Sequence, residues 1–261
     1  MFWIAIGAAI LSGLAVFAWM RGRLTALESE RSRVEAELEA SRAELDSVHR
    51  KVEDAAFIDP LTGLRNRRYF SVLIGPEVLR SLRAHAGGKT GGKPAKSDLI
   101  FYLVDLDNFK TVNDLYGQEA GDRVLVETAR RLASVARQSD LLVRWGGEEF
   151  LLVCRDAARA EAQALAGRLL EVIGNTPFDA GGGREARLTC SVGWAPFPWL
   201  LGEPSAQSHE EVLTVADRAL LLAKEAGRNR SVGSRPGASG GSSKFEAGGI
   251  GFDVEVLAGP L

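Results

Sequence analysis

Three acidic residues stand out because each lies beside a short apolar run. Asp105 ends the run DLIFYLVD, and Glu148 and Glu149 follow the glycine pair in LLVRWGGEEFLLV. Apolar neighbours would hold these carboxylates in place, and a charge at the end of a buried strand needs a partner. Adjacent carboxylates repel each other, so a metal ion or a metal–polyphosphate complex is a natural ligand. The alternative for the glutamates is a surface hairpin with two solvated side chains.

The surrounding sequence predicts the elements that hold these carboxylates. Gly146–Gly147 lies between two runs of strand-forming residues and predicts a β-hairpin, since glycine reaches positive φ without a Cβ clash. Asp98–Asp105 is predicted to be a buried strand. Asp107, just beyond it, could cap the following helix. Lys110 comes within about a turn of the strand end, a spacing that suits a phosphate beside a metal.

Helical and apolar patterns continue along the chain. Helices are expected over 67–84, with an interruption at Gly75–Pro76, and over 123–136, 157–173 and 210–226, with a further strand at 188–195. Gly227 suits the position just after a helix end. The order of elements predicts an α+β fold in which helices cover one side of a mixed antiparallel sheet.

Composition limits the possible partners and the compartment. The chain has 261 residues, of which 46% are hydrophobic, enough for one ordinary domain with appendages. Its net charge of −2 gives no basic field, so no nucleic-acid partner is expected. Cys154 and Cys190 lie in apolar runs and are expected to be buried free thiols, with a single disulfide left open.

Residues 1–23 are predicted to form a transmembrane helix with a basic flank. The run from Phe2 to Met20 carries no charged residue and, as a helix, would span roughly 28 Å. Because Arg21 and Arg23 follow it, the positive-inside rule predicts a single-pass membrane protein whose remaining chain is cytoplasmic. A cleaved signal peptide is the alternative, although no basic residue precedes the run.

The next segments differ in composition. Residues 24–56 have apolar residues at heptad spacing, Leu38 and Leu45 among them, which predicts a dimeric coiled coil; a single amphipathic helix lying on the next domain is the alternative. Residues 84–97 are rich in glycine and lysine and are expected to form a loop. Residues 233–261 are predicted to be a Gly/Ser-rich disordered tail, which leaves a domain over 57–232.

Five motifs, in this order, resemble the GGDEF family of diguanylate cyclases. They are DPLTGLRNRR at Asp59, DLDNFKTVND at Asp105, GQEAGD at Gly117, RWGGEEF at Arg144 and ADRALLLAKEAGRNR at Ala216. One such match is weak, but five in register are specific. The resemblance implies a ferredoxin-like βαββαβ core, similar to the palm of polymerases and nucleotide cyclases.

The resemblance also implies a reaction. Two GTP molecules are condensed to cyclic di-GMP and two pyrophosphates, as the 3′-hydroxyl of one GTP attacks the α-phosphate of the other. The implied cofactor is Mg²⁺, or Mn²⁺ in its place. Each domain holds one GTP, so a homodimer must bring two half-sites together. With the predicted span, this implies an enzyme of the bacterial inner membrane.

Matching positions carry the implied roles. The metal ligands would be Asp105, Glu148 and the Leu106 carbonyl, with Glu148 or Glu149 also helping to deprotonate the hydroxyl. The implied substrate-binding residues are Phe109, Lys110, Lys224 and Arg228 for the phosphates, Asn113 and Asp122 for guanine, Gln118, and Gly146 and Gly147, which leave space for the nucleotide. Gln118 stands where the family usually has histidine, and Leu221 where it usually has tyrosine.

A second site is implied for the product. Arg137 and Asp140 match the family's inhibitory RxxD pair, with Arg168 in a supporting position; the alternative is an ion pair at a helix end. Two other functions stay open: a receptor that binds cyclic di-GMP through this pair without catalysis, and a coiled-coil scaffold for partner docking.

Overall fold

The computed structural model describes residues 2–87, 96–236, 245–247 and 250–258. The chain forms two compact units, Met1–Ala56 and Phe57–Leu261. The first unit is almost entirely the helix α1, which spans Phe2–Phe57. Within α1, the structure describes the side chains of 16–17, 19–25, 27–48 and 56–57.

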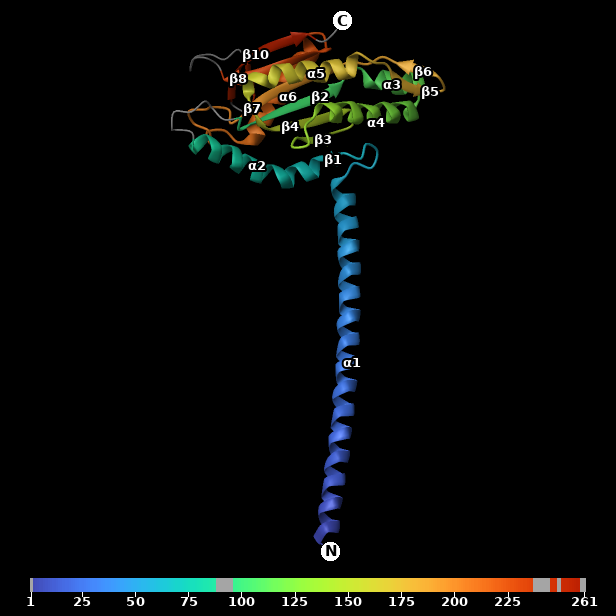
Figure 1. The fold of residues 1–261 in the computed structure, drawn as a ribbon. Helices are drawn as coiled ribbons and strands as arrows, with labels where there is room; N and C mark the ends of the chain where they lie inside the picture. Colours follow the sequence, from blue (N-terminus) through green and yellow to red (C-terminus); the bar gives the residue numbers. More distant parts are fainter. Residues whose placement is uncertain (1, 88–95, 237–244, 248–249, 259–261) are drawn as a thin grey trace. The chain divides into compact units, whose positions relative to one another are not determined.

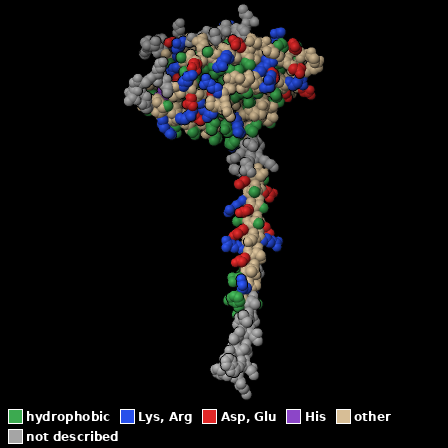
Figure 2. Space-filling view, in the orientation of Figure 1, with side chains coloured by type: hydrophobic (Ala, Val, Ile, Leu, Met, Phe, Trp, Pro, Cys, Tyr) green, Lys and Arg blue, Asp and Glu red, His purple; other side chains and the backbone are tan. Residues whose placement is uncertain are grey.

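The described part of α1 carries an apolar stripe between charged residues. Its apolar members are 50–66% exposed; they are Leu24, Leu27, Val34, Leu38, Leu45 and Val48. Lysine or arginine and aspartate or glutamate side chains alternate along the same surface (Figure 2). Arg31–Glu35 and Arg33–Glu37 form ion pairs of 2.7 and 3.0 Å. The helix is therefore confirmed, while its pairing with a second copy stays a prediction.

The predicted membrane span falls largely outside what the structure describes. It lies within α1, but the side chains of residues 1–15 are not among the described ones. Among the residues that were described, no helix has a stretch long and apolar enough to cross a bilayer. The span at Phe2–Met20 therefore stays a prediction.

The second unit is built on a mixed sheet of eight strands (Figure 1). The strands in sheet order are β1 (Arg65–Asn66), β3 (Leu141–Arg144), β4 (Glu149–Ala157), β2 (Asp98–Leu106), β7 (Cys190–Phe197), β8 (Arg230–Pro236), β10 (Ile250–Ala258) and β9 (Phe245–Ala247). The central four, β3-β4-β2-β7, pair antiparallel. With helices between β2 and β3 and between β4 and β7, they form the predicted ferredoxin-like βαββαβ core. A short hairpin, β5 (Phe178–Gly181) and β6 (Arg184–Ala186), stands apart.

Helices cover both faces of this sheet. The helices α3 (Phe109–Tyr116), α4 (Gln118–Val135) and α5 (Ala162–Gly174, after a 3₁₀ turn at Arg159–Glu161) contribute to one core. The helices α2 (Arg67–Gly87) and α6 (His209–Glu225) contribute to the other. The prediction that helices cover one side only is wrong, because β2 is apolar on both faces and every one of its residues is buried.

Three further predictions needed correction or confirmation. The expected interruption of α2 at Gly75–Pro76 is wrong: the helix continues through Pro76, because Phe70 and Ile74 anchor its buried face. Both cysteines are buried and free, as expected. The predicted loop at 84–97 overlaps the end of α2 at Gly87, and residues 88–95 lie outside the described chain.

The predicted disordered tail is wrong for most of the residues that the structure describes after 233. The strand β10 pairs antiparallel with β8 from Phe252↔Pro236 to Ala258↔Arg230, and β9 pairs with β10. The segment IGFDVEVLA alternates apolar and polar residues, which suits a strand that adds to a sheet edge. A Gly/Ser-rich composition just before it hid this pattern.

The packing of α6 on β7 gives a test of the fold. A Cβ at Gly193 would lie 2.2 Å from both the Ala216 carbonyl oxygen and the Leu220 nitrogen. Because backbone atoms cannot move aside easily, Gly193→Ala should lower the free energy of unfolding by about 1–3 kcal/mol or more. Urea unfolding followed by circular dichroism measures this change.

Gly75→Ala is the matched control. A Cβ there meets no atom within 4 Å, in the middle of α2. Alanine has a higher helix propensity than glycine, so stability should stay equal or rise by about 1 kcal/mol. Equal stability of Gly193→Ala and wild type would contradict the close packing of α6 on β7.

Candidate functional site

The predicted carboxylates come together at one end of the central strand. Asp105, near the end of β2, is 4% exposed and stands opposite Glu149 at the start of β4. The Leu106 amide donates to the Glu148 carbonyl oxygen at 3.3 Å. The strand end and the hairpin therefore meet, as the sequence predicted, and the alternative of a hairpin with freely solvated glutamates is wrong since both are only partly exposed.

Hydrogen bonds close the hairpin between β3 and β4. The Trp145 and Gly146 amides donate to the Glu149 carbonyl oxygen at 2.8 and 3.2 Å. Positive φ was expected at Gly146 and Gly147, but the described glycines with positive φ lie elsewhere. A Cβ at Gly146 would lie 2.9 Å from Glu149 Oε2, so a side chain there would require the flexible Glu149 carboxylate to move.

One arginine holds the hairpin loop to the start of the domain. The Arg144 guanidinium donates to Asp59 Oδ1 at 2.9 Å and to the Gly147 carbonyl oxygen at 2.8 Å. Asp59 Oδ1 also accepts from the Thr62 amide and hydroxyl at 2.8 and 2.7 Å, which fixes the turn in DPLTGL. Neither Arg144 nor Asp59 was predicted to have a role, although both lie inside motifs that resemble the GGDEF family.

Positive charge from α6 faces the acidic centre. Lys224 Nζ lies 2.8 Å from Asp105 Oδ2. Burial raises the pKa of Asp105, while Lys224 and Arg228 act in the opposite direction. Burial and the nearby Asp105 charge raise the pKa of Glu148 and of Glu149. The three carboxylates therefore share one electrostatic environment with two cations at its edge.

The donor set fits a hard divalent cation. Asp105 and Glu148 supply carboxylate oxygens, which Mg²⁺ and Mn²⁺ prefer, and the adjacent Leu106 carbonyl is of the same class. Their raised pKa values reflect burial first and then neighbouring negative charge, which a divalent cation would neutralise. Within the described residues, no cluster of three or more histidine, cysteine, aspartate or glutamate side chains is arranged around a metal position, so the remaining ligands would be water and substrate oxygens.

The residues expected to read guanine lie on neighbouring helices. Asn113 belongs to α3, and Gln118 and Asp122 to the first turns of α4. Asn113 Oδ1 is buried and has no hydrogen-bond partner in the described chain, so it could accept from a ligand. A Cβ at Gly121 would clash with this oxygen, so a side chain there would displace the Asn113 amide from its present position.

Two of the phosphate residues differ in their exposure. Lys110 is exposed at the start of α3, where it can reach a phosphate. Phe109 is 6% exposed and packs in the core, so its aromatic side chain serves packing. Its contact with the triphosphate stays a prediction.

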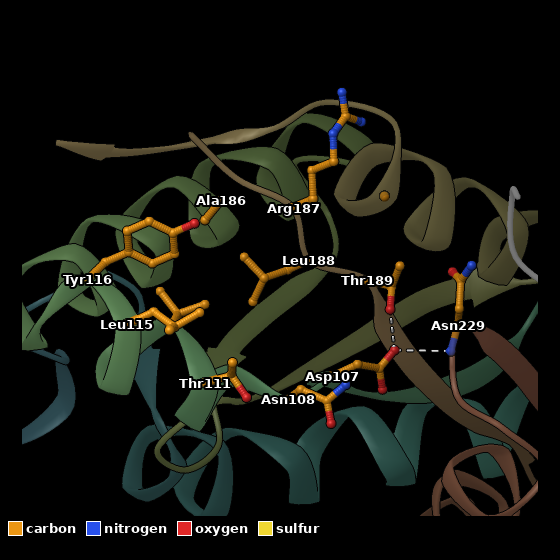
Figure 3. Close-up of a pocket in the computed structure, with 12 residues that line it drawn as sticks. Asp107, Asn108, Thr111, Leu115, Tyr116, Ala186, Arg187, Leu188, Thr189 and Asn229 are labelled. Carbon is orange, nitrogen blue, oxygen red and sulfur yellow. Dashed lines mark hydrogen bonds between the residues drawn. The ribbon is translucent and has the colours of Figure 1, made fainter. Parts of the chain in front are cut away.

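The sequence allowed Asp107 to cap the helix that follows it, but Asp107 does not cap α3. The N-cap residue is Asn108, and it makes no side-chain capping bond. Asp107 Oδ2 instead accepts from Thr189 Oγ1 and from the Asn229 amide, beside a pocket of about 510 Å³ (Figure 3). The carboxylate therefore ties β2 to two distant parts of the chain.

Arg137, Asp140 and Arg168 line a common pocket between α4 and α5. Asp140 Oδ2 accepts from the Arg137 backbone amide at 2.8 Å. The Arg137 guanidinium is exposed, and the carboxylate nearest to it is Glu161, at 3.9 Å. Asp140 therefore binds the Arg137 backbone and not its guanidinium, so no Arg137–Asp140 ion pair forms, while the product site stays a prediction.

A ferredoxin-like core with carboxylates at a strand end and on the facing hairpin defines a domain of the nucleotide-cyclase class. Residues 56–230 match the sequence pattern of the diguanylate cyclase GGDEF domain, and the chain therefore belongs to the GGDEF family.

Two curated relatives and one solved structure illustrate the similarity. The chain is 38% identical to response regulator PleD of Caulobacter vibrioides, over 69% of this chain and 36% of PleD. It is 35% identical to diguanylate cyclase DgcP of Pseudomonas aeruginosa, over 80% of this chain and 28% of DgcP. The chain thus spans about a third of the length of these relatives.

The solved structure contains a coiled coil and a GGDEF domain, those of DgcB from Caulobacter crescentus, in complex with cyclic di-GMP. It superposes with a TM-score of 0.60 at 26% identity and covers 75% of this chain and 96% of the DgcB chain.

The raised pKa values give a pH-dependent prediction for the protein in a chelating buffer. Glu148 holds its proton more tightly when folded than its ordinary pKa of 4.5 implies, so the folded state binds more protons than the unfolded state. The contribution of Glu148 to stability is therefore greatest below pH 4.5 and is lost as the pH rises through its raised pKa. Glu148→Gln should raise the free energy of unfolding at pH 7 by about 0.5 kcal/mol and change it less at pH 4.

Urea unfolding at the two pH values measures this effect. Glu171→Gln, an exposed change on α5, is the control and should leave stability unchanged at both. A Glu148→Gln protein less stable than wild type at pH 7 would show that Glu148 is favourably paired and the electrostatic description wrong.

Proposed function

We propose that the chain is a diguanylate cyclase that condenses two GTP into cyclic di-GMP and two pyrophosphates. The convergence of Asp105, Glu148 and Glu149 at the end of β2 carries this proposal. Carboxylates held in place beside lysine and arginine suit a reaction in which phosphate charge must be bound and neutralised.

The acidic centre would hold the metal. Asp105 and Glu148, helped by the Leu106 carbonyl, would bind Mg²⁺ or Mn²⁺. Bound there, the ion would lower the pKa of the attacking 3′-hydroxyl and neutralise charge on the α-phosphate. Glu149, whose pKa is raised by burial and by Asp105, is suited to accept the hydroxyl proton.

The remaining residues would bind and orient GTP. Lys224 and Arg228, whose charges already act on Asp105, would move to the triphosphate, and Lys110 would add a third cation. The Asn113 and Asp122 side chains offer acceptors for the guanine N1–H and N2–H₂ groups. Adenine lacks both of these donors, so this pair would select GTP over ATP.

Dimerisation completes the reaction, because each domain binds one of the two GTP molecules. The apolar stripe of α1, 50–66% exposed, would pair with that of a second copy as a coiled coil. Such pairing raises the local concentration of the second half-site. Together with the run at 2–20, it would make the protein a membrane-anchored homodimer of the bacterial inner membrane, with the catalytic domain in the cytoplasm.

The cyclase assay is the direct test of this function. Full-length protein in detergent, given GTP and Mg²⁺, should form cyclic di-GMP, and Glu148→Ala should reduce the rate by roughly a thousandfold or more, because it removes a metal ligand. Product is quantified by liquid chromatography. Glu171→Ala, a surface control, should retain the wild-type rate. Absence of product from wild type at high protein concentration would refute the proposal.

The coiled coil can be tested with a matched pair of double variants. Leu38→Asp with Leu45→Asp places two charges on the apolar stripe and should weaken self-association at least tenfold, with a parallel loss of turnover in dilute protein. Ala36→Asp with Ala43→Asp adds the same charges to the opposite face and should change neither. Analytical ultracentrifugation reports association. If stripe and control variants behaved alike, α1 would not be the dimer interface.

Product inhibition gives a further prediction. Arg137 would bind a phosphate or guanine of cyclic di-GMP at the surface around the small pocket, about 30 Å³, that it lines with Asp140 and Arg168. Arg137→Ala should raise the inhibition constant for cyclic di-GMP by about tenfold or more, at an unchanged initial rate. Arg130→Ala, an exposed arginine on α4 paired with Glu127, is the control. Equal inhibition of all three proteins would exclude the pocket as the inhibitory site.

A further inference from the structure

Asp107 is a buried carboxylate to which the proposed reaction gives no role. It follows Asp105 by two residues and is 4% exposed. Its Oδ1 atom accepts from Ser191 Oγ at 2.7 Å. Its Oδ2 atom accepts from Thr189 Oγ1 at 2.6 Å and from the Asn229 amide at 3.0 Å (Figure 3). Three donors at these distances compensate a buried negative charge and fix the side chain.

The three donors come from two separate parts of the chain. Thr189 and Ser191 lie at the start of β7, next to β2 in the sheet, and the Asp107 amide also donates to the Thr189 carbonyl oxygen at 2.9 Å. Asn229 lies in the turn between α6 and β8. Asp107 is therefore the point where the end of β2 is joined to the turn that follows α6.

That turn has an unusual backbone. At the end of α6, the Gly227 amide donates to the Lys224 carbonyl oxygen at 3.2 Å, and the Arg228 amide donates to the Ala223 carbonyl oxygen at 3.0 Å. Such bonds are expected where a glycine follows a helix end. Three successive residues have positive φ: Gly227 at 113°, Arg228 at 61° and Asn229 at 46°. A left-handed conformation is unfavourable for arginine, so contacts outside the turn must hold it.

The same turn carries the proposed phosphate-binding cations. Arg228 is within it, and Lys224, on the last turn of α6, reaches Asp105 at 2.8 Å. The Asn229 amide that binds Asp107 immediately follows Arg228 in the chain. By accepting a hydrogen bond from the Asn229 amide, the Asp107 carboxylate therefore fixes the position of the Arg228 backbone relative to the acidic centre.

We infer that Asp107 is a positioning residue: by accepting from the Asn229 amide, it holds the Arg228 turn in the conformation that binds the GTP triphosphate. The inference rests on the proposed function. Asp107 itself touches neither substrate nor metal in this account. Its effect on GTP passes through Arg228, and this distinguishes it from a residue that only stabilises the fold.

A double-mutant cycle in the full-length protein tests this. The probe is the α,β-methylene analogue of GTP, given together with Mg²⁺. This analogue cannot be cleaved between the α- and β-phosphates, the bond that the reaction breaks. Calorimetry gives its affinity. Asp107→Ala should weaken binding by about tenfold. In an Arg228→Ala background, the same change should weaken it less than about twofold, because the group that it positions is already absent.

Two further variants separate positioning from stability. Asp107→Asn keeps an acceptor for the Asn229 amide and should retain most of the affinity for the analogue. This variant also keeps the inference testable if Asp107→Ala does not fold. Asp98→Asn is the matched control, since Asp98 is a buried carboxylate at the opposite end of β2, paired with Arg159 at 2.8 Å. It should lower the unfolding temperature without changing the affinity for the analogue.

The outcomes distinguish this inference from the proposed function. Two results would overturn the positioning role while wild type still binds: additive losses for Asp107→Ala and Arg228→Ala, or equal affinities of Asp107→Ala and Asp107→Asn for the analogue. No binding of the analogue by wild-type protein would overturn the proposed function itself, and the inference with it.

Discussion

Repulsion among carboxylates at the end of β2 is the constraint on which the rest of the site depends. Asp105 is almost fully buried, and the pKa of Glu148 and of Glu149 is raised by their own burial and then by the Asp105 charge. Isolated charges in such a position are unfavourable, so the arrangement persists only where cations face it. Lys224 Nζ already faces the carboxylates, 2.8 Å from Asp105 Oδ2. A divalent ion bound with a triphosphate would neutralise their charge more completely.

The topology turns this local repulsion into a site. Because β2 is central, its end lies between the β3–β4 hairpin on one side and the start of β7 on the other. Arg144 fixes the hairpin to Asp59, and Asp107 fixes the turn after α6 to β2. Segments far apart in sequence therefore meet at one strand end, where ionic and charge-assisted hydrogen bonds add to the apolar packing.

Strong local patterns made much of this predictable from sequence. The apolar run before Asp105, the glycine pair and Gly227 each mark a backbone feature that the structure confirms. Long-range polar contacts were not predictable: nothing in the sequence near Asp107 indicates that Thr189, Ser191 and Asn229 would bind it. The burial of Phe109 in the core was also not predicted, because its motif pointed only to a ligand. The strand β10 was missed because its alternation follows a Gly/Ser-rich segment.

The central claim is that Asp105 and Glu148 share a divalent ion when nucleotide binds. Anomalous diffraction from crystals grown with Mn²⁺ and the α,β-methylene analogue of GTP measures this directly, since manganese stands in for magnesium and scatters anomalously. The account predicts a peak within coordination distance, about 2.0–2.3 Å, of oxygens from both side chains, beside the analogue's phosphates. A peak bound by neither carboxylate, or a bound analogue whose phosphates lie away from this strand end, would contradict it.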